Sequence, residues 1–427
     1  MSVDPRIHEV QTAPVDEGAA AALAARGYEL RLVDPADREA VERYLQAENR
    51  GFLGGALPDR ALQAHAAEYT ASRRMSAVYD PEGADPLTPI ATSASWIGPL
   101  TLPGEQEIDA WAIAGVTTAQ THRRRGIQRQ IIEAELRTAH RLGVPIAMLT
   151  VSESSIYGRY GFGVAALAAE YRVDTRDLRW TGPSVGGRLD FIPVTRWREQ
   201  APDLFEQTRL RDPGQVQPFA LRWDEIAGFA AREGDKSGER FAVQYRDDAG
   251  VVRGMAIYTV SADPEVFTRH RVNVLQVIAV SDDAYAAIWR FFVEMDLVAS
   301  LGYDLGAVDE RLPWMVSNFR AVQSKPFDMQ YVRVLDVPRV LEARGFESDG
   351  EVAFAVTDDL GIAGGAWRLR AGPDGVVSSL DGAVDTDETV TVAELSALVA
   401  GGIPPGSSSE LSRLLRGSRT PWLGSWY

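Results

Sequence analysis

The sequence predicts an α/β protein with two mixed-sheet domains in tandem, followed by a smaller α+β domain. The stretch 111–163 contains a buried strand, a helix and a second buried strand in that order. A similar strand-to-helix order recurs around residues 271–303, and alternating strands and short helices follow Ser324. We therefore predict domains at residues 1–178, 179–322 and 323–427.

The first domain begins with a segment that has no clear hydrophobic periodicity. Residues 1–27 are polar or alanine-rich, and we expect a loosely held extension. YELRLVD (28–34) alternates like a first strand, and residues 35–45 read as a helix with Asp34 as its cap. A second helix is then expected at residues 58–69, and a hairpin with strands at 75–80 and 86–98 follows it. The strand 111–118, a helix from Gly126 to about Leu142 and the strand 144–151 complete the domain.

The second domain repeats this order with one chemical difference. Its predicted elements are a strand at 188–194, a helix at 203–211, a hairpin at 240–247 and 251–260, a strand at 271–280 and a helix over 282–303. Asp282 and Asp283 begin that helix, where the first copy has THRRRG. Because carboxylates compete with a phosphate for the helix dipole, we predict a degenerate copy that binds no cofactor.

The third domain is predicted from shorter elements. Strands are expected at residues 351–358 and 366–372, separated by Gly/Asp turns. Helices are expected at 392–402, with Thr391 as the cap, and at 407–417. Together they indicate an α+β unit.

The composition restricts the classes of function. A net charge of −16 argues against nucleic acid as a partner and suits amine substrates, although acidic surfaces also serve solubility. The absence of cysteine excludes disulfides, thiolate catalysis and cysteine-ligated metals, and we expect no metal cofactor. No run approaches the ~20 apolar residues of a membrane span, and a secretory signal is not recognisable. We therefore expect a cytoplasmic protein.

Three arginines and a glycine mark an anion site at the start of the first predicted crossover helix. In THRRRGIQR (121–129) the arginines precede a helix N-terminus, where free N–H groups and the dipole favour a phosphate. The alternative is a solvated basic helix end. The motif is neither a Walker loop nor a dinucleotide fingerprint. It resembles the pyrophosphate loop of the GNAT acetyltransferase superfamily, with Arg123, Gly126 and Gln128 at the pattern positions and the last small residue missing.

The loop after the second strand narrows the resemblance. THRRRG, a helix and then SESSIYGRYGFG (152–163) closely resemble the enhanced-intracellular-survival (Eis) acetyltransferases, a multi-domain GNAT family. The segments MQYVRVLDVPRVLEARGF and VTVAELSALVAGG resemble that family's C-terminal domain, which is related to sterol carrier proteins. The resemblance implies two tandem GNAT-like domains, a sterol-carrier-protein-like domain and a homohexamer.

The resemblance also implies roles for individual residues. It implies that the backbone of Val116, Thr117 and Thr118 pairs with the pantetheine arm of acetyl-CoA. The pyrophosphate would lie within the loop and the helix start, which are Arg123, Arg124, Arg125, Gly126, Ile127, Gln128 and Arg129. The serine-glutamate pair Ser152 and Glu153 would border the same cleft. Tyr157 falls on the family's general acid, and the C-terminal carboxylate, here on Tyr427, falls on its general base.

Acid–base chemistry agrees with those roles. Acetyl transfer to an amine requires removal of a proton from an ammonium of pKa ~10. A phenol of pKa ~10 can protonate a leaving thiolate whose thiol has pKa ~8.5. An α-carboxylate of pKa ~3.3–3.7 needs burial or a relaying water to act as the base. Without the resemblance, Tyr157 would read as a half-buried structural tyrosine.

The acceptor site departs from the family pattern. The tail ends Ser425-Trp426-Tyr427, so the acidic residue that precedes the last residue in well-known members is missing, and Trp426 can offer a cation–π face instead. Phe52, in the glycine-rich segment 46–57, and Trp96 are candidates for the amine pocket, with packing in the core as the alternative.

Taken together, the sequence predicts an acetyl-CoA-dependent N-acetyltransferase for aminoglycoside- or polyamine-like amines. Two alternatives stay open. One is an apolar-ligand-binding protein with a vestigial acetyltransferase site, and the other is a protein-lysine acyltransferase.

Overall fold

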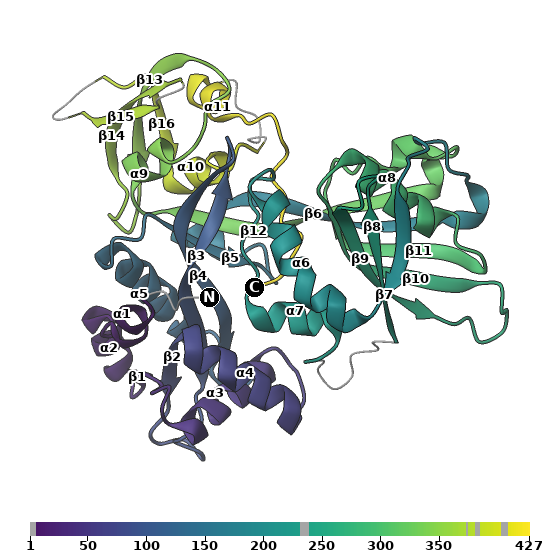
Figure 1. The fold of residues 1–427 in the computed structure, drawn as a ribbon. Helices are drawn as coiled ribbons and strands as arrows, with labels where there is room; N and C mark the ends of the chain where they lie inside the picture. Colours follow the sequence, from purple (N-terminus) through teal and green to yellow (C-terminus); the bar gives the residue numbers. More distant parts are fainter. Residues whose placement is uncertain (1–5, 231–238, 373–374, 381–384, 403–408) are drawn as a thin grey trace. The chain divides into compact units, whose positions relative to one another are not determined.

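The computed structural model describes residues 6–230, 239–372, 375–380, 385–402 and 409–427. The chain forms two compact units. The first contains residues up to Ala165, residues 330–419 and Tyr427, and the second contains residues 166–329 and 420–426. Each is described by itself; the elements are labelled in Figure 1. Among the described residues no helix has the length and hydropathy needed to cross a membrane.

A mixed sheet forms the centre of the first unit. Its strands are β1 (Glu29–Leu32), β2 (Arg74–Tyr79), β3 (Ala91–Leu102), β4 (Gln106–Thr118), β5 (Ile146–Thr150) and the end of β12 (Val322–Val334), in that spatial order. All neighbours are antiparallel except β4 and β5, which are parallel and joined by α5 (Ile127–Arg141). The predicted strands, the hairpin and the crossover helix of this region are confirmed.

Helices cover both faces of this sheet. The helices α1 (Ile7–Thr12), α2 (Glu17–Ala24) and α5 pack on one face, where Trp111, Ile132 and Leu136 belong to one buried cluster. The helices α3 (Arg38–Gly51) and α4 (Asp59–Ser72) lie side by side (Figure 1) and bury Val41, Tyr44 and Met75 on the other face.

Two expectations about the N-terminal segment were wrong. Residues 7–24 are not loosely held: Ala19 and Leu23 are fully buried, and Asp16 caps α2 while its carboxylate accepts from Arg137 Nε at 2.9 Å. The alanines that look featureless in sequence pack closely against α5. The helix predicted at 35–45 begins at Arg38 and is capped by Asp37, because Asp34 instead accepts from the amide of Ala36 in a turn.

The C-terminal part of the first unit is a separate four-stranded sheet. Its order is β15 (Val376–Ser379), β14 (Gly365–Ala371), β13 (Gly350–Thr357) and β16 (Glu388–Thr391). The helices α9 (Val337–Glu342), α10 (Val392–Leu398) and α11 (Glu410–Leu415) accompany it. Thr391 caps α10 in a capping box with Glu394, as predicted from the local sequence.

The second unit contains another mixed sheet. Its order is β6 (Gly163–Asp174), β11 (Val298–Gly306), β10 (His270–Ala279), β9 (Val252–Ser261), β8 (Arg240–Arg246) and β7 (Arg188–Ile192). The helices are α6 (Val194–Arg209), α7 (Ala220–Ala227) and α8 (Asp282–Val293). The chain from β10 through α8 to β11 repeats the parallel crossover of the first unit.

The helix predicted over 282–303 is too long. It ends at Val293, and residues from Val298 on form β11, parallel to β10. Leu297, in the turn between them, stands at φ 65°, outside the helical region. The aspartates stand at the start of α8 as expected, with Ser281 as its cap.

Candidate active site

The sheet of the first unit opens between its two parallel strands. The pairing of β4 with β5 runs from Ala110 and Ile146 to Ile113 and Leu149 in the described residues. Beyond that point β4 continues to Thr118, paired with β3 on its other edge. A register shift opposite Thr92 and Ala94, with Gly115 at φ 59°, bends the strand there. An extended ligand can therefore pair with the free edge of β4.

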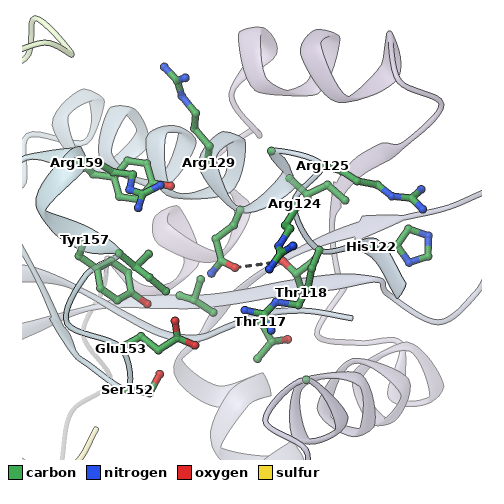
Figure 2. Close-up of a pocket in the computed structure, with 18 of the residues that line it drawn as sticks. Thr117, Thr118, His122, Arg124, Arg125, Arg129, Ser152, Glu153, Tyr157 and Arg159 are labelled. Atoms are coloured by element: carbon green, nitrogen blue, oxygen red, sulfur yellow. Dashed lines mark hydrogen bonds between the residues drawn. The ribbon is translucent and has the colours of Figure 1, made fainter. Parts of the chain in front are cut away.

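A pocket of about 790 Å³ lies at this opening. All of the residues predicted to bind the cofactor line it: Val116, Thr117, Thr118, Arg123, Arg124, Arg125, Gly126, Ile127, Gln128, Arg129, Ser152 and Glu153. Tyr157 and Phe52 line it as well. In Figure 2, Ser152, Glu153 and Tyr157 lie at one end of the pocket, and Arg125 and His122 lie at the other.

The arginine loop leads directly into α5. Gly126 is the N-cap at φ 70°, and no side chain caps the helix, so the first amides are open to an anion. A Cβ on Gly126 would lie 2.8 Å from Nη1 of Arg26, which donates to the carbonyl of Arg125 at 2.6 Å. The left-handed backbone conformation therefore favours glycine at this position.

The arginines of this loop have different partners. Arg125 donates to the Tyr28 hydroxyl at 2.6 Å and to the Thr121 carbonyl at 3.2 Å. Arg129 pairs with Glu133 at 2.7 Å and extends away from Thr117 and Thr118 (Figure 2). Arg124, at φ 62°, has no hydrogen-bond or ion-pair partner in the part of the chain that the structure describes. Among these three it is therefore the guanidinium whose N–H groups are all available to a ligand.

Tyr157 begins a short turn of 3₁₀ helix, η2 (Tyr157–Tyr160), after β5. Its side chain is buried against Phe162, with ring centroids 5.9 Å apart and edge to face. Burial, with smaller contributions from Tyr160 and Glu153, raises the pKa of Tyr157 to about 12. The phenol is therefore protonated at neutral pH, the form that a proton donor needs.

The ring of Tyr427 lies on the opposite face of the sheet. Paired residues of neighbouring strands share a face, as do residues two apart along a strand. By this rule Trp96, Ala112, Met148, Thr150 and Gln330 share one face. The alternating residues Ile113 and Leu149 belong instead to the cluster that contains Tyr157.

Two contacts hold Tyr427 on that face. Its hydroxyl accepts from Nε2 of Gln330 at 3.2 Å, and its ring stands perpendicular to Trp96 with centroids 6.0 Å apart. Burial raises the pKa of the Tyr427 phenol above its ordinary value. Its partner Gln330 pairs with Thr150, two residues before Ser152. Tyr427 and Tyr157 therefore flank the region in which β4 and β5 separate.

Trp96 does not line the described pocket. The guanidinium of Arg73 covers its ring at 3.2 Å from the centroid, and Tyr427 packs at its edge. Burial lowers the pKa of Arg73 to about 10, and Glu68 lies 3.4 Å away. Trp426 is partly exposed and belongs to the second unit, where Ser425 accepts from Arg222 Nε and donates to the Trp426 carbonyl.

Sequence reasoning missed the carboxylate of Glu48 on α3. Its Oε2 lies 2.5 Å from where a Cβ on Gly115 would stand, and Tyr69 donates to its two oxygens at 3.0 and 3.1 Å. Gly51, one turn later, meets Thr117 so closely that a side chain there would overlap it. The glycine in ENRG is the sequence signal for this approach of α3 to β4.

Sequence reasoning also missed several residues of the pocket, two of them from a distant segment of the chain. Asp359 and Leu360, in the turn between β13 and β14, line it beside the residues of the first sheet. Nothing in their local sequence indicates this position. In the described residues no group of three or more His, Asp or Glu side chains is arranged to hold a metal ion.

Comparisons with known proteins agree with this geometry. Residues 33–165 and 214–334 each match an acetyltransferase (GNAT) domain family, and residues 337–421 match a sterol carrier protein domain family. These matches confirm two GNAT domains followed by a sterol-carrier-like domain.

Relatives that match over most of their own length are also N-acetyltransferases by name. An uncharacterized N-acetyltransferase of Streptomyces avermitilis is 31% identical over 89% of this chain and 94% of its own. N-acetyltransferase Eis of Mycobacterium tuberculosis is 30% identical over 68% of this chain and 71% of its own. The crystal structure of Eis1 from Mycobacterium abscessus has the same fold, with a TM-score of 0.77 and 23% identity over 94% of this chain and all of that one. The chain therefore belongs to the Eis family of GNAT N-acetyltransferases, enzymes that transfer an acetyl group and draw on an acyl-CoA.

Proposed function

We propose that this protein transfers acetyl from acetyl-CoA to cationic amines of the aminoglycoside or polyamine class, by direct attack of the amine on the thioester. The observation that carries the proposal is the opening between β4 and β5, with Tyr157 on one face of the sheet and the last residue, Tyr427, on the other. Donor and acceptor can then meet in the opening from opposite faces.

The cofactor-side residues divide into backbone and side-chain contacts. The open amides from Gly126 to Gln128 and the guanidinium of Arg124 suit the pyrophosphate. The free edge of Val116 to Thr118 suits the amides of the pantetheine arm. Ser152 and Glu153 border the same pocket at the end of β5.

Tyr157 is proposed as the general acid. The amine nitrogen forms a bond to the thioester carbon, the carbon–sulfur bond breaks, and the phenol gives its proton to the departing thiolate. The proton that the acylated nitrogen then loses restores the phenol. The pKa of about 12 keeps the phenol protonated before this step. A positioned acid contributes roughly 10²–10⁴-fold to such a reaction.

The C-terminal carboxylate of Tyr427 is proposed as the general base. It accepts, directly or through a water molecule, the proton that the substrate ammonium must lose before its nitrogen can attack. The phenol of the same residue is anchored by Gln330 and Trp96, which limits the positions open to the carboxylate. Glu48, on the same side of the sheet, supplies a negative charge for a cationic acceptor.

The proposal also includes the acceptor-site residues, the domain boundaries, the assembly and the location that the sequence and its family resemblance suggest. Phe52, Trp96 and Trp426 are proposed to contribute to the acceptor site, and the second GNAT domain is proposed to bind no acyl-CoA. We also propose three domains near residues 1–178, 179–322 and 323–427, a homohexamer and a cytoplasmic location. Light scattering after size exclusion tests the assembly.

A C-terminal extension gives the decisive test. Two glycines added after Tyr427 move the carboxylate away from the site, and we expect kcat to fall at least about 100-fold. The affinity for acetyl-CoA should stay within about twofold, since the cofactor residues lie elsewhere in the sequence. Thiol release is followed with a panel of aminoglycosides, polyamines and lysine peptides, and a protein with the same extension at its N-terminus is the control. Full activity of the C-terminally extended protein would rule out the carboxylate as the base.

A further inference from the structure

A buried arginine joins the turn that carries Tyr157 to the C-terminal sheet. Arg333, at the end of β12, is fully buried. Its Nη2 donates to both carboxylate oxygens of Asp358 at 2.8 and 2.7 Å, and its Nε donates to the carbonyl of Tyr160 at 3.3 Å. Tyr160 closes the same 3₁₀ turn that Tyr157 begins. One guanidinium therefore connects the catalytic turn to the end of β13.

Asp358 in turn organises the loop between β13 and β14. Its carboxylate accepts from the backbone amides of Leu360, Ile362 and Ala363 at 3.1, 2.9 and 2.7 Å. Charge-assisted bonds of this kind are stronger than neutral ones and fix the loop locally. The loop, residues 358–363, is called the β13–β14 turn below.

The β13–β14 turn reaches the pocket and the catalytic tyrosine. Leu360 and Asp359 line the pocket with Tyr157. Leu360 and Ile362 also pack against the buried cluster that includes Tyr157, Tyr160 and Phe162. The same short loop therefore lines the pocket and packs against the cluster that holds the proposed acid.

Two glycines show how closely α10 approaches the catalytic turn. A Cβ on Gly161, which stands at φ 85°, would lie 2.6 Å from Cγ1 of Val392 and 3.2 Å from Nε of Arg333. A Cβ on Gly163 would overlap the carbonyl of Ala393. The glycines of YGRYGFG therefore allow α10 and Arg333 to press against this turn.

We propose that Arg333 and Asp358 are positioning residues for Tyr157, and that the β13–β14 turn forms one wall of the acyl-CoA pocket. The inference rests on the proposed role of Tyr157 as the general acid. It gives the sterol-carrier-like segment a part in the reaction that is separate from the terminal carboxylate. Arg333 acts through the turn and does not itself contact substrate.

A double-mutant cycle on kcat separates positioning from general stability. Tyr157→Phe should lower kcat by about 100-fold or more, because the proton donor is lost. Arg333→Met, which keeps an unbranched buried chain, should lower kcat about tenfold or more with the KM of the amine unchanged. Since Arg333 acts through Tyr157, the double variant should be no more than about threefold below Tyr157→Phe.

Arg344 supplies a matched control. It is another buried arginine of the same unit, and it donates to the carbonyls of Leu398, Val399 and Leu415; in the described residues it has no hydrogen bond to the turn Tyr157–Tyr160. Arg344→Met should reduce thermal stability while kcat stays within about twofold of wild type. An equal loss of kcat in Arg344→Met, or losses that multiply in the double variant, would overturn the proposal.

Two milder variants cover the case in which Arg333→Met does not fold. Arg333→Lys keeps the charge beside Asp358 but lacks the separate Nε that donates to the Tyr160 carbonyl, so kcat should fall severalfold. Leu360→Ala should raise the KM for acetyl-CoA severalfold without changing the KM of the amine; unchanged kinetics in both variants would also refute the inference. If Tyr157→Phe retains wild-type kcat, the proposed acid itself is wrong, an outcome distinct from additive losses.

Discussion

Replacing Arg124 by glutamine should weaken binding of acetyl-CoA far more than the same change at Arg129. Arg124 lines the pocket without a partner among the described residues, whereas Arg129 already pairs with Glu133 at 2.7 Å. A charge-assisted hydrogen bond is worth about 1.5–3 kcal/mol. At about 1.4 kcal/mol per factor of ten, Arg124→Gln should raise Kd by about 10–150-fold. Arg129→Gln, which loses an exposed helical pair, should change Kd less than about threefold.

Titration calorimetry with acetyl-CoA measures both variants directly. The loss of affinity in Arg124→Gln should become smaller as salt rises from roughly 50 to 300 mM, because added ions screen the charge contact in the wild type. Circular dichroism confirms that the two variants remain folded. Equal losses in the two variants, or a change below threefold at Arg124, would show that helix amides and not this guanidinium hold the pyrophosphate.

Three further predictions follow from the same structure. Glu48→Gln should raise the KM of a cationic amine about tenfold while the KM of acetyl-CoA is unchanged, since Glu48 lies on the proposed acceptor side of β4; steady-state kinetics with both substrates varied measures this, and a raised KM for acetyl-CoA alone would contradict it. The raised pKa of Tyr157, about 12, keeps the acid protonated as pH rises, so kcat should show no alkaline loss centred near pH 10; a fall to half at that pH would mean that the acid titrates like a free phenol. Leu23→Ala should lower the free energy of unfolding by about 2–5 kcal/mol, because Leu23 is fully buried beneath α5; a loss below 1 kcal/mol in urea unfolding, roughly that of a surface change, would restore the view of a loose extension.

The local parts of the fold and of the cofactor site follow from the sequence. Strand and helix periods, Gly126 at the start of α5 and the capping box at Thr391 depend on neighbours a few residues away. The anion site has the same origin, because a helix start and its preceding loop are contiguous in the chain. The pattern of THRRRG predicted an anion site, the family resemblance added Val116 to Thr118 with Ser152 and Glu153, and all of these residues line one pocket.

The remaining features depend on contacts between distant segments. No local sequence signal marks the burial of Leu23, the approach of Glu48 to Gly115 or the packing of Tyr427 on Trp96. An alanine-rich segment, a glutamate or a terminal residue has the same sequence whether or not a partner from a distant segment packs against it. Asp359 and Leu360 reach the pocket from a distant segment, where Arg333 of β12 donates both to Tyr160 in the turn that carries Tyr157 and to Asp358 in the β13–β14 turn. Such positions are set by strand register and side-chain packing over more than a hundred residues of sequence. Periodicity predicts that a strand is present, whereas the face and the partner of each side chain are determined when the sheet assembles.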